Sequence, residues 1–222
     1  MYYHGNTGGD IAKTITDSLL IPIVSDKYPA LKHALSEEHL VNDEPIINNV
    51  KRYESDGTGI TSLDYEVTFE NKDIISIHLF YESMGAHPSE YQEWYTYNIH
   101  TGKLYPISNE INQTGLKWIF QTYKANYHKA INQDQRWRTK EDEDYKKDEA
   151  EEKLYYDDLR HSIDSLSFKE MFANWAFTAK GVLFITEYVL PHARQSYEPG
   201  RAWEVPYAKL RPYKKPTAIV VK

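Results

Sequence analysis

A turn of small residues, a strand rich in tyrosine and a second glycine turn follow one another between residues 85 and 103. The stretch begins with Gly85-Ala86-His87-Pro88 and ends with Thr101-Gly102-Lys103. Its middle carries aromatic side chains at Trp94, Tyr95 and Tyr97. One amphipathic helix cannot contain two such turns, so the stretch predicts a strand and marks the centre of a sheet protein.

The residues before this stretch predict two more strands. Apolar side chains occupy every second position at Leu63, Tyr65, Val67 and Phe69. This alternation predicts a strand with one buried face and one face in water. Asn71-Lys72 predicts a hairpin, and residues 74–81 are apolar at most positions on both faces, as in a more central strand. Together with residues 91–99, they predict a meander of three strands.

A different period begins after Thr114. Apolar residues recur there at spacings of three and four, at Leu116, Ile119, Phe120, Tyr123, Tyr127 and Ile131. Such spacing predicts a long amphipathic helix packed on the sheet. Residues 140–153 then contain eight acidic and four basic side chains, which we interpret as a solvated helix or an insertion. A metal-binding tract of acids is the alternative for this segment.

The two ends of the chain add shorter elements. Residues 15–24 predict a strand, residues 29–40 a helix, and Pro45 the start of a second helix. Near the C-terminus, residues 168–175 predict a helix that leads into a strand, and Ala179-Lys180-Gly181 predicts a hairpin turn. The expected fold class is α+β: a single domain in which an antiparallel sheet, a meander plus a C-terminal hairpin, packs against the long amphipathic helix.

The composition limits the organisation and the partners. The 222 residues can bury one large core, and we expect a flexible lead at residues 1–10, a domain at 11–213 with a charged helical insertion near 140–160, and a tail at 214–222. The net charge of -7 argues against nucleic acid as a partner. The chain has no cysteine, which excludes disulfides and thiolate chemistry. No apolar run approaches the roughly 20 residues that cross a bilayer.

Several motifs occur in an order that resembles a known family. They are Tyr28-Pro29, Gly85-Ala86-His87-Pro88, Thr101-Gly102-Lys103, Gly181-Val182-Leu183-Phe184, Glu187-Tyr188 and Glu204-Val205-Pro206-Tyr207-Ala208-Lys209-Leu210. This order resembles the DUF3298 family, the domain found at the C-terminus of the bacterial anti-sigma factor RsiV and in front of a peptidoglycan deacetylase domain. The resemblance covers about residues 28–213.

The resemblance implies an extracytoplasmic domain, periplasmic or on the outer surface, with a membrane or lipid anchor before it. The first residues lack the basic and apolar parts of a secretory signal, so a cytoplasmic protein is the alternative. The anti-sigma members bind lysozyme, and the domain beside the deacetylases is accessory. We therefore expect a non-catalytic cell-envelope recognition module without a cofactor, which binds a lysozyme-like protein or a peptidoglycan or other glycan ligand.

Large aromatic side chains and one histidine are the candidate ligand-binding residues, because such rings dominate protein interfaces and stack on sugars. They are His87, Trp94, Tyr95, Tyr97, Tyr197 and Trp203. Tyr95 and Tyr97 share one face of their strand and Trp94 lies on the other, so we expect one of the two sets to be exposed. His87 is interpreted first as a residue of the turn.

A cell-wall-acting hydrolase, or another enzyme that uses paired carboxylates, is the alternative function, since hydrolases of this kind place the two groups across a cleft. The sequence offers Glu90, Glu93, Glu187 and Glu204 for this role. Nucleophile elbows, phosphate loops and dinucleotide fingerprints do not occur in the sequence. His78, His100 and Glu93 could lie close together if the strands pair as expected, but their spacing is not that of a zinc site.

Overall fold

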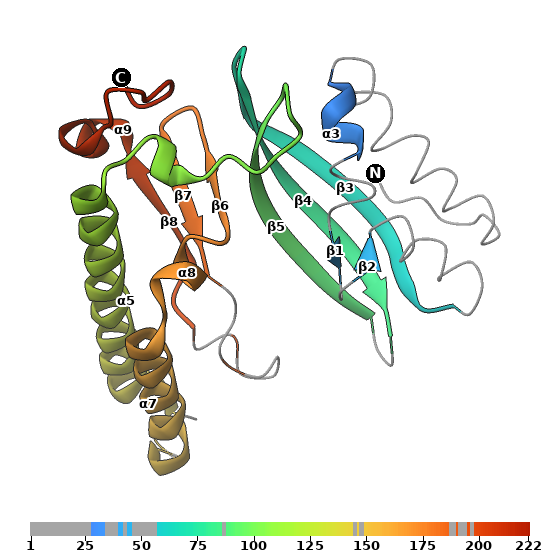
Figure 1. Ribbon diagram of the computed structural model, residues 1–222. Helices are drawn as coiled ribbons and strands as arrows, with labels where there is room; N and C mark the ends of the chain where they lie inside the picture. The colour runs from blue at the N-terminus through green and yellow to red at the C-terminus, as the bar shows by residue number, and fades with distance from the viewer. Residues whose placement is uncertain are drawn as a thin grey trace. The chain divides into compact units, whose positions relative to one another are not determined.

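The computed structural model describes most of the chain after residue 56 and short pieces before it. The described residues are 28–33, 40–41, 44–45, 57–85, 88–143, 146, 149–186, 190, 195 and 198–222. They divide into two compact units (Figure 1). Unit 1 contains the chain up to Pro106 together with Ala176–Ala179, and unit 2 contains Ile107–Trp175 and Lys180–Lys222.

The centre of unit 1 is an antiparallel meander. Its strands are β3 (Gly59–Glu70), β4 (Ile74–Met84) and β5 (Pro88–Asn98), in the order β3-β4-β5 (Figure 1). Two register shifts interrupt the pairing of β3 with β4, whereas β4 and β5 pair without a shift along their whole length. The meander predicted from the alternation of apolar residues is confirmed.

One face of this sheet forms the core of unit 1. The buried side chains of the core are Tyr28, Leu31, Ile60, Leu63, Ile75, Ile77, Leu79, Tyr81 and Tyr97. Leu31 belongs to the short helix α3 (Pro29–His33), and Tyr28 immediately precedes it. The odd-numbered positions of β4 point to this face, because the side chains of a strand alternate between its two sides.

The N-terminal elements differ from the predictions. The described helix ends at His33, and Leu40–Val41 form β1 rather than the end of a helix. Pro45 lies in β2 (Glu44–Pro45), opposite Leu40, and the residues after it, where the second helix is predicted, lie outside the described residues. Proline also fits the edge of a small sheet, where its missing N–H breaks no ladder, so its position in the sequence did not decide between the two structures. The predicted strand at 15–24 lies outside the described residues.

Part of the other face of the meander is covered by the segment Ala176–Ala179 of the same unit. The Phe177 N–H donates to Ser76 Oγ at 3.0 Å, and Thr68 Oγ1 donates to the Phe177 carbonyl at 2.8 Å. Ser76 Oγ also lies 2.7 Å from Thr96 Oγ1. Ser76 and Thr96 are therefore buried with their hydroxyl groups hydrogen-bonded, as buried polar groups require.

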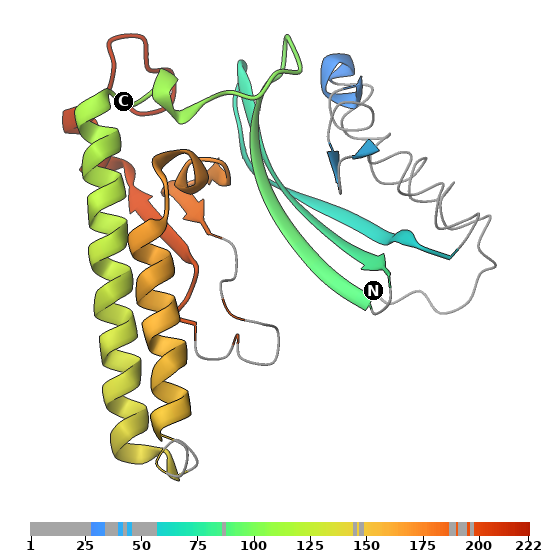
Figure 2. The ribbon, with the colours of Figure 1, turned by 60° about the horizontal axis from the view of Figure 1, so that its bottom comes forward.

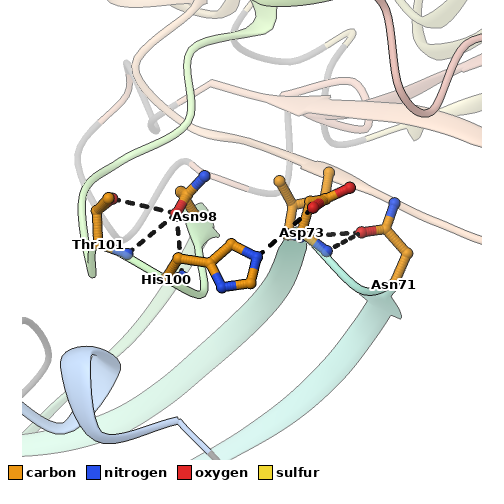
Figure 3. Close-up of polar contacts among 6 residues, drawn as sticks. Asn71, Asp73, Asn98, His100 and Thr101 are labelled. Atoms are coloured by element: carbon orange, nitrogen blue, oxygen red, sulfur yellow. Dashed lines mark hydrogen bonds and ion pairs between the residues drawn. The ribbon is translucent and has the colours of Figure 1, made fainter.

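Two turns close one end of the meander through asparagine side chains (Figure 3). Asn71 Oδ1 accepts the N–H groups of Asp73 and Ile74, and Asn98 Oδ1 accepts those of His100 and Thr101. The predicted hairpin at Asn71-Lys72 and the predicted turn at Thr101-Gly102-Lys103 are confirmed, and Gly102 adopts a left-handed φ of 68°. The His100 ring lies 3.5 Å from the Asp73 carboxylate in an exposed pair that contributes little stability.

Unit 2 contains a pair of antiparallel helices, α5 (Gln113–Glu141) and α7 (Glu149–Ser165) (Figure 2). Asn112 caps α5 by accepting the Gly115 N–H at 2.9 Å. Polar bonds join the two helices, including His128 to Asp164 at 2.8 Å and the Tyr156 hydroxyl to Asp134 at 2.5 Å. The long amphipathic helix predicted after Thr114 is confirmed.

The second sheet has the strand order β6-β7-β8, with β6 at Trp175–Phe177, β7 at Gly181–Ile185 and β8 at Ala202–Pro206. The helix α8 (Phe168–Met171) leads into it, which confirms the predicted helix-to-strand transition and the C-terminal hairpin. In unit 2, Tyr123 of α5 packs on Trp203 of β8 at 6.0 Å between ring centroids. The α+β class is thus confirmed, with the long helix against the C-terminal strands.

A buried carboxylate in unit 2 holds the end of the chain. Glu110, 0% exposed, follows the short 3-10 helix η2 (Ile107–Asn109). Its carboxylate accepts the N–H groups of three consecutive residues, Ile219, Val220 and Val221. Ile219, Val220 and Val221 are β-branched, as in many strands, but they form no strand because their N–H groups bond to this side chain. Two further short helices, α9 (Tyr207–Leu210) and η4 (Arg211–Tyr213), precede this tail.

Among the helices that the structure describes, none combines the length and the apolar composition needed to cross a bilayer.

Candidate functional site

Four of the six predicted ligand-binding residues lie in described parts of the structure. Trp94, Tyr95 and Tyr97 are on β5 of unit 1, and Trp203 is on β8 of unit 2. The structure therefore groups the three residues of β5 together and places Trp203 in a separate cluster. His87 and Tyr197 lie outside the described residues.

Tyr95 and Tyr97 belong to the core face of the meander. Tyr97 is 3% exposed, and the half-buried Tyr95 hydroxyl donates to Glu93 Oε2 at 2.9 Å. Glu93 Oε1 accepts the Tyr81 hydroxyl at 3.0 Å, so one carboxylate bridges two tyrosines. Burial and the negative charge of Glu93 raise the pKa of Tyr95 far above its ordinary value. The Tyr81 and Tyr95 hydroxyls thus link β4 and β5 through the Glu93 carboxylate.

Trp94 lies on the opposite face and is also covered. It is 9% exposed and stacks flat on the His78 ring, with centroids 3.8 Å apart and an interplanar angle of 10°. Phe80 meets the same histidine edge to face at 4.5 Å. We expected one aromatic set of β5 to be exposed, but ring stacking covers Trp94 and the core covers Tyr97. The aromatic residue of β5 that is exposed is Tyr91, which stacks on Tyr81.

Trp203 belongs to an aromatic cluster between β8 and α5, where it contacts Tyr123 and Phe184. The polar edge of this cluster joins the loop before β8 to the helix. The Tyr123 hydroxyl lies 2.6 Å from Thr186 Oγ1, and the Arg201 guanidinium donates to the Thr186 carbonyl at 2.9 Å. These contacts position Trp203 as a packing residue of unit 2.

Among the carboxylates considered for a hydrolase, Glu90 and Glu93 do not form a pair. Glu90 and Glu93 are three residues apart on one strand, so they lie on opposite faces of the sheet. Both oxygens of Glu93 already accept tyrosine hydroxyls. Glu204 is exposed on β8 of unit 2, and Glu187 lies outside the described residues. The geometry gives the Glu90–Glu93 pair no shared cleft in which to work.

The strands likewise separate the residues considered for zinc. His78 pairs with Trp94 on one face, whereas Glu93 pairs with Leu79 on the other. His100 lies in the turn after β5, beside Asp73 (Figure 3). Within the part of the chain that is described, no three acidic or histidine side chains gather in a way that could hold a metal ion.

A different surface emerges from the register of the three strands. Cross-strand neighbours bring together Asp64, Phe80 and Gln92 in one row, Glu66, His78 and Trp94 in the next, and Ser62, Glu82 and Glu90 in a third. We call this surface the acidic face. Its four carboxylates, Asp64, Glu66, Glu82 and Glu90, are all exposed. The strands β3, β4 and β5 contain no lysine or arginine, so nothing on them neutralises this charge.

The sequence interpretation missed most of this surface, although a signal was present. Asp64 and Glu66 are the polar residues between the apolar positions of β3, and no lysine or arginine occurs from Asp73 to Gly102. Glu82 and Glu90 are recognised as part of this face only from the register, which places them opposite each other. The acids of β3, β4 and β5 lie on one face only because of the register in which the three strands pair.

His78 makes the stability of unit 1 depend on pH. Burial lowers its pKa below 6.5, against the smaller opposing effects of the Glu66 charge and a hydrogen bond with Gln92. His78 therefore binds a proton more readily in the unfolded chain than in the folded unit. The free energy of unfolding falls as the pH drops below 6.5, because protonation of His78 favours the unfolded chain. We expect His78→Phe, which keeps an aromatic ring, to lose less stability than the wild type between pH 7.5 and pH 5. Urea unfolding at both pH values measures this difference, and equal losses in the two proteins would contradict it.

A comparison with solved structures finds a similar protein. No protein-family model matches the sequence, and no curated protein matches it. Among solved structures, a DUF3298 family protein from Pseudomonas aeruginosa PAO1 is similar, with 16% sequence identity and a TM-score of 0.45 over 89% of this chain and 79% of that chain. The DUF3298 description names no activity or ligand.

Proposed function

We propose that the chain is a non-catalytic recognition module of the bacterial cell envelope that binds a cationic, lysozyme-like protein through the acidic face. The observation that carries this proposal is the acidic face itself: four exposed carboxylates on three strands without a lysine or arginine. A surface of one sign attracts a partner of the opposite sign and speeds their encounter. Lysozymes are typically cationic, and an envelope location brings the two together.

The acidic face favours a protein over a glycan as the ligand. Sugar rings bind by stacking on exposed aromatic rings, but Trp94 is covered by His78 and is only 9% exposed. Tyr91 is the large aromatic residue that β5 exposes, at 40%. Exposed carboxylates therefore outnumber exposed aromatic rings on the meander. Peptidoglycan fragments serve as the comparison ligand in the binding experiment.

Calorimetry with hen-type lysozyme at low and moderate salt tests the proposal. A variant that neutralises the acidic face, with Asp64→Asn, Glu66→Gln, Glu82→Gln and Glu90→Gln, is expected to bind about tenfold more weakly, which corresponds to about 1.4 kcal/mol. Its binding should also depend less on salt, since fewer charges are screened.

A matched control removes the same number of charges elsewhere. The control variant carries Glu141→Gln, Glu143→Gln, Asp157→Asn and Asp158→Asn in unit 2, on α5, on α7 and between them, and we expect it to bind like the wild type. Equal weakening of both variants would show that net charge alone is responsible. No binding of lysozyme, or binding of muropeptides alone, would overturn the proposed protein ligand.

A further inference from the structure

The strand β5 is the edge of its sheet, and part of its outer side is already bonded. The Tyr105 N–H donates to the Thr96 carbonyl at 2.8 Å, and the Asn98 N–H donates to the Lys103 carbonyl at 2.9 Å. Both contacts lie on the side of β5 that faces away from β4. They show that the backbone groups of even-numbered residues on this strand point outward.

The same alternation continues toward the start of β5, because its pairing with β4 has no register shift. The backbone N–H and C=O groups of Glu90 and Gln92 therefore point outward too. No residue that the structure describes bonds to them from that side. The side chains from Pro88 to Gln92 are all exposed. The first half of β5 is thus an open edge, which is a template for another strand.

We propose that this edge, from Pro88 to Gln92, accepts an extended basic segment of the partner as a fourth strand of the meander. The inference rests on the proposed function and deepens it, since it names how the partner binds. Main-chain hydrogen bonds to Glu90 and Gln92 supply affinity, and side chains at alternate positions supply selectivity. The carboxylate of Glu90 lies beside the incoming strand on one face and Glu93 on the other, while Glu82 pairs with Glu90 from β4, one strand further from the edge.

These charges decide which segment fits the edge. Opposite charges on neighbouring strands stabilise the pair and like charges destabilise it, so an acidic segment is rejected. A second copy of β5 would bring its own Glu90 and Glu93 to the same edge, which disfavours self-pairing. Charged edges protect natural sheets from unwanted partners, and here the acids select lysine and arginine.

Amide hydrogen exchange, followed by NMR, tests the edge with defined probes. One probe is a synthetic peptide of alternating lysine and valine, and the matched control alternates glutamate and valine. The basic peptide is expected to slow exchange at the Glu90 and Gln92 amides by about tenfold or more, since both become hydrogen-bonded, and the acidic peptide should not. If the basic peptide at millimolar concentration leaves both amides unchanged, the inference is wrong.

A proline substitution provides a second test, with intact lysozyme as the probe. Gln92→Pro removes one outward N–H without removing a bond to β4, and edge strands tolerate proline at such positions. We expect Gln92→Pro to bind lysozyme about tenfold more weakly and Gln92→Ala, which loses the same side chain, to bind within about twofold of the wild type. The NMR spectrum of each variant checks that it is folded.

The outcomes separate this inference from the proposed function. If Gln92→Pro binds lysozyme as well as Gln92→Ala does, while the neutralised acidic face does not bind, the function stands and the strand addition is refuted. If lysozyme does not bind the wild type but the basic peptide protects Glu90 and Gln92, the proposed ligand is wrong and the edge is confirmed as a strand acceptor.

Discussion

Replacing Glu110 with alanine is expected to lower the free energy of unfolding of unit 2 by about 3 kcal/mol or more. The Glu110 side chain is fully buried, and its Oε1 accepts the Ile219 N–H at 2.9 Å. Its Oε2 accepts the N–H groups of Val220 at 3.0 Å and Val221 at 2.9 Å. The substitution leaves the buried Val221 N–H and the part-buried Ile219 and Val220 N–H groups without their acceptor, and an unsatisfied buried group costs about 1–3 kcal/mol.

A second variant separates hydrogen bonding from side-chain volume. Glu110→Gln keeps the size of the side chain but exchanges one acceptor oxygen for an N–H₂ group that faces N–H donors. We therefore expect it to recover only part of the loss. Urea unfolding measures both variants, and hydrogen exchange at residues 219–221 shows whether the tail is released. If Glu110→Ala is as stable as the exposed control Asp158→Ala, the carboxylate does not hold the tail.

The Gly181→Ala substitution is expected to destabilise the C-terminal strands by about 3 kcal/mol, the upper end of what an overpacked core costs. Gly181 lies at the start of β7, opposite Pro206 of β8. A Cβ at this position would lie 2.8 Å from the Val205 carbonyl carbon and 2.9 Å from Pro206 Cα, and it would overlap the Val205 carbonyl oxygen. All three atoms are backbone, so no side chain can rotate to relieve the overlap.

Gly200 is the matched control for this substitution. It is exposed in the same unit, and a Cβ there would meet no atom within 4 Å. Gly200→Ala should change the free energy of unfolding by no more than about 0.5 kcal/mol. Thermal unfolding of the two variants beside the wild type gives the comparison. Similar melting temperatures for Gly181→Ala and Gly200→Ala would show that β7 and β8 can move apart without cost.

Local patterns allowed much of this fold to be predicted. The alternation from Leu63 to Phe69 becomes β3, and the spacing of three and four from Leu116 to Ile131 becomes the buried stripe of α5. Asn71 and Gly102 form the expected turns because their own side chain or backbone freedom determines the local conformation. Each of these features depends on residues close together in the chain.

Features that depend on distant residues could not be predicted in the same way. Glu110 bonds to residues more than 100 positions away, and no local pattern distinguishes it from an exposed acid. The burial of Trp94 depends on His78 of the neighbouring strand, and the acidic face depends on the register of three strands. Pro45 fits a helix start and an edge strand equally well, so the fold around it decides.

The absence of lysine and arginine from β3, β4 and β5 also determines which chemical methods can locate a bound partner on the meander. Trypsin cuts after lysine and arginine, and the chain offers it no site between Lys72 and Lys103. Digestion by trypsin therefore reports nothing about β4 and β5, whether or not a partner covers them. Reagents that couple amines fail there for the same reason. A carbodiimide, which joins a carboxylate directly to a lysine amine, would link Asp64, Glu66, Glu82 or Glu90 to a basic partner and mark the place of contact.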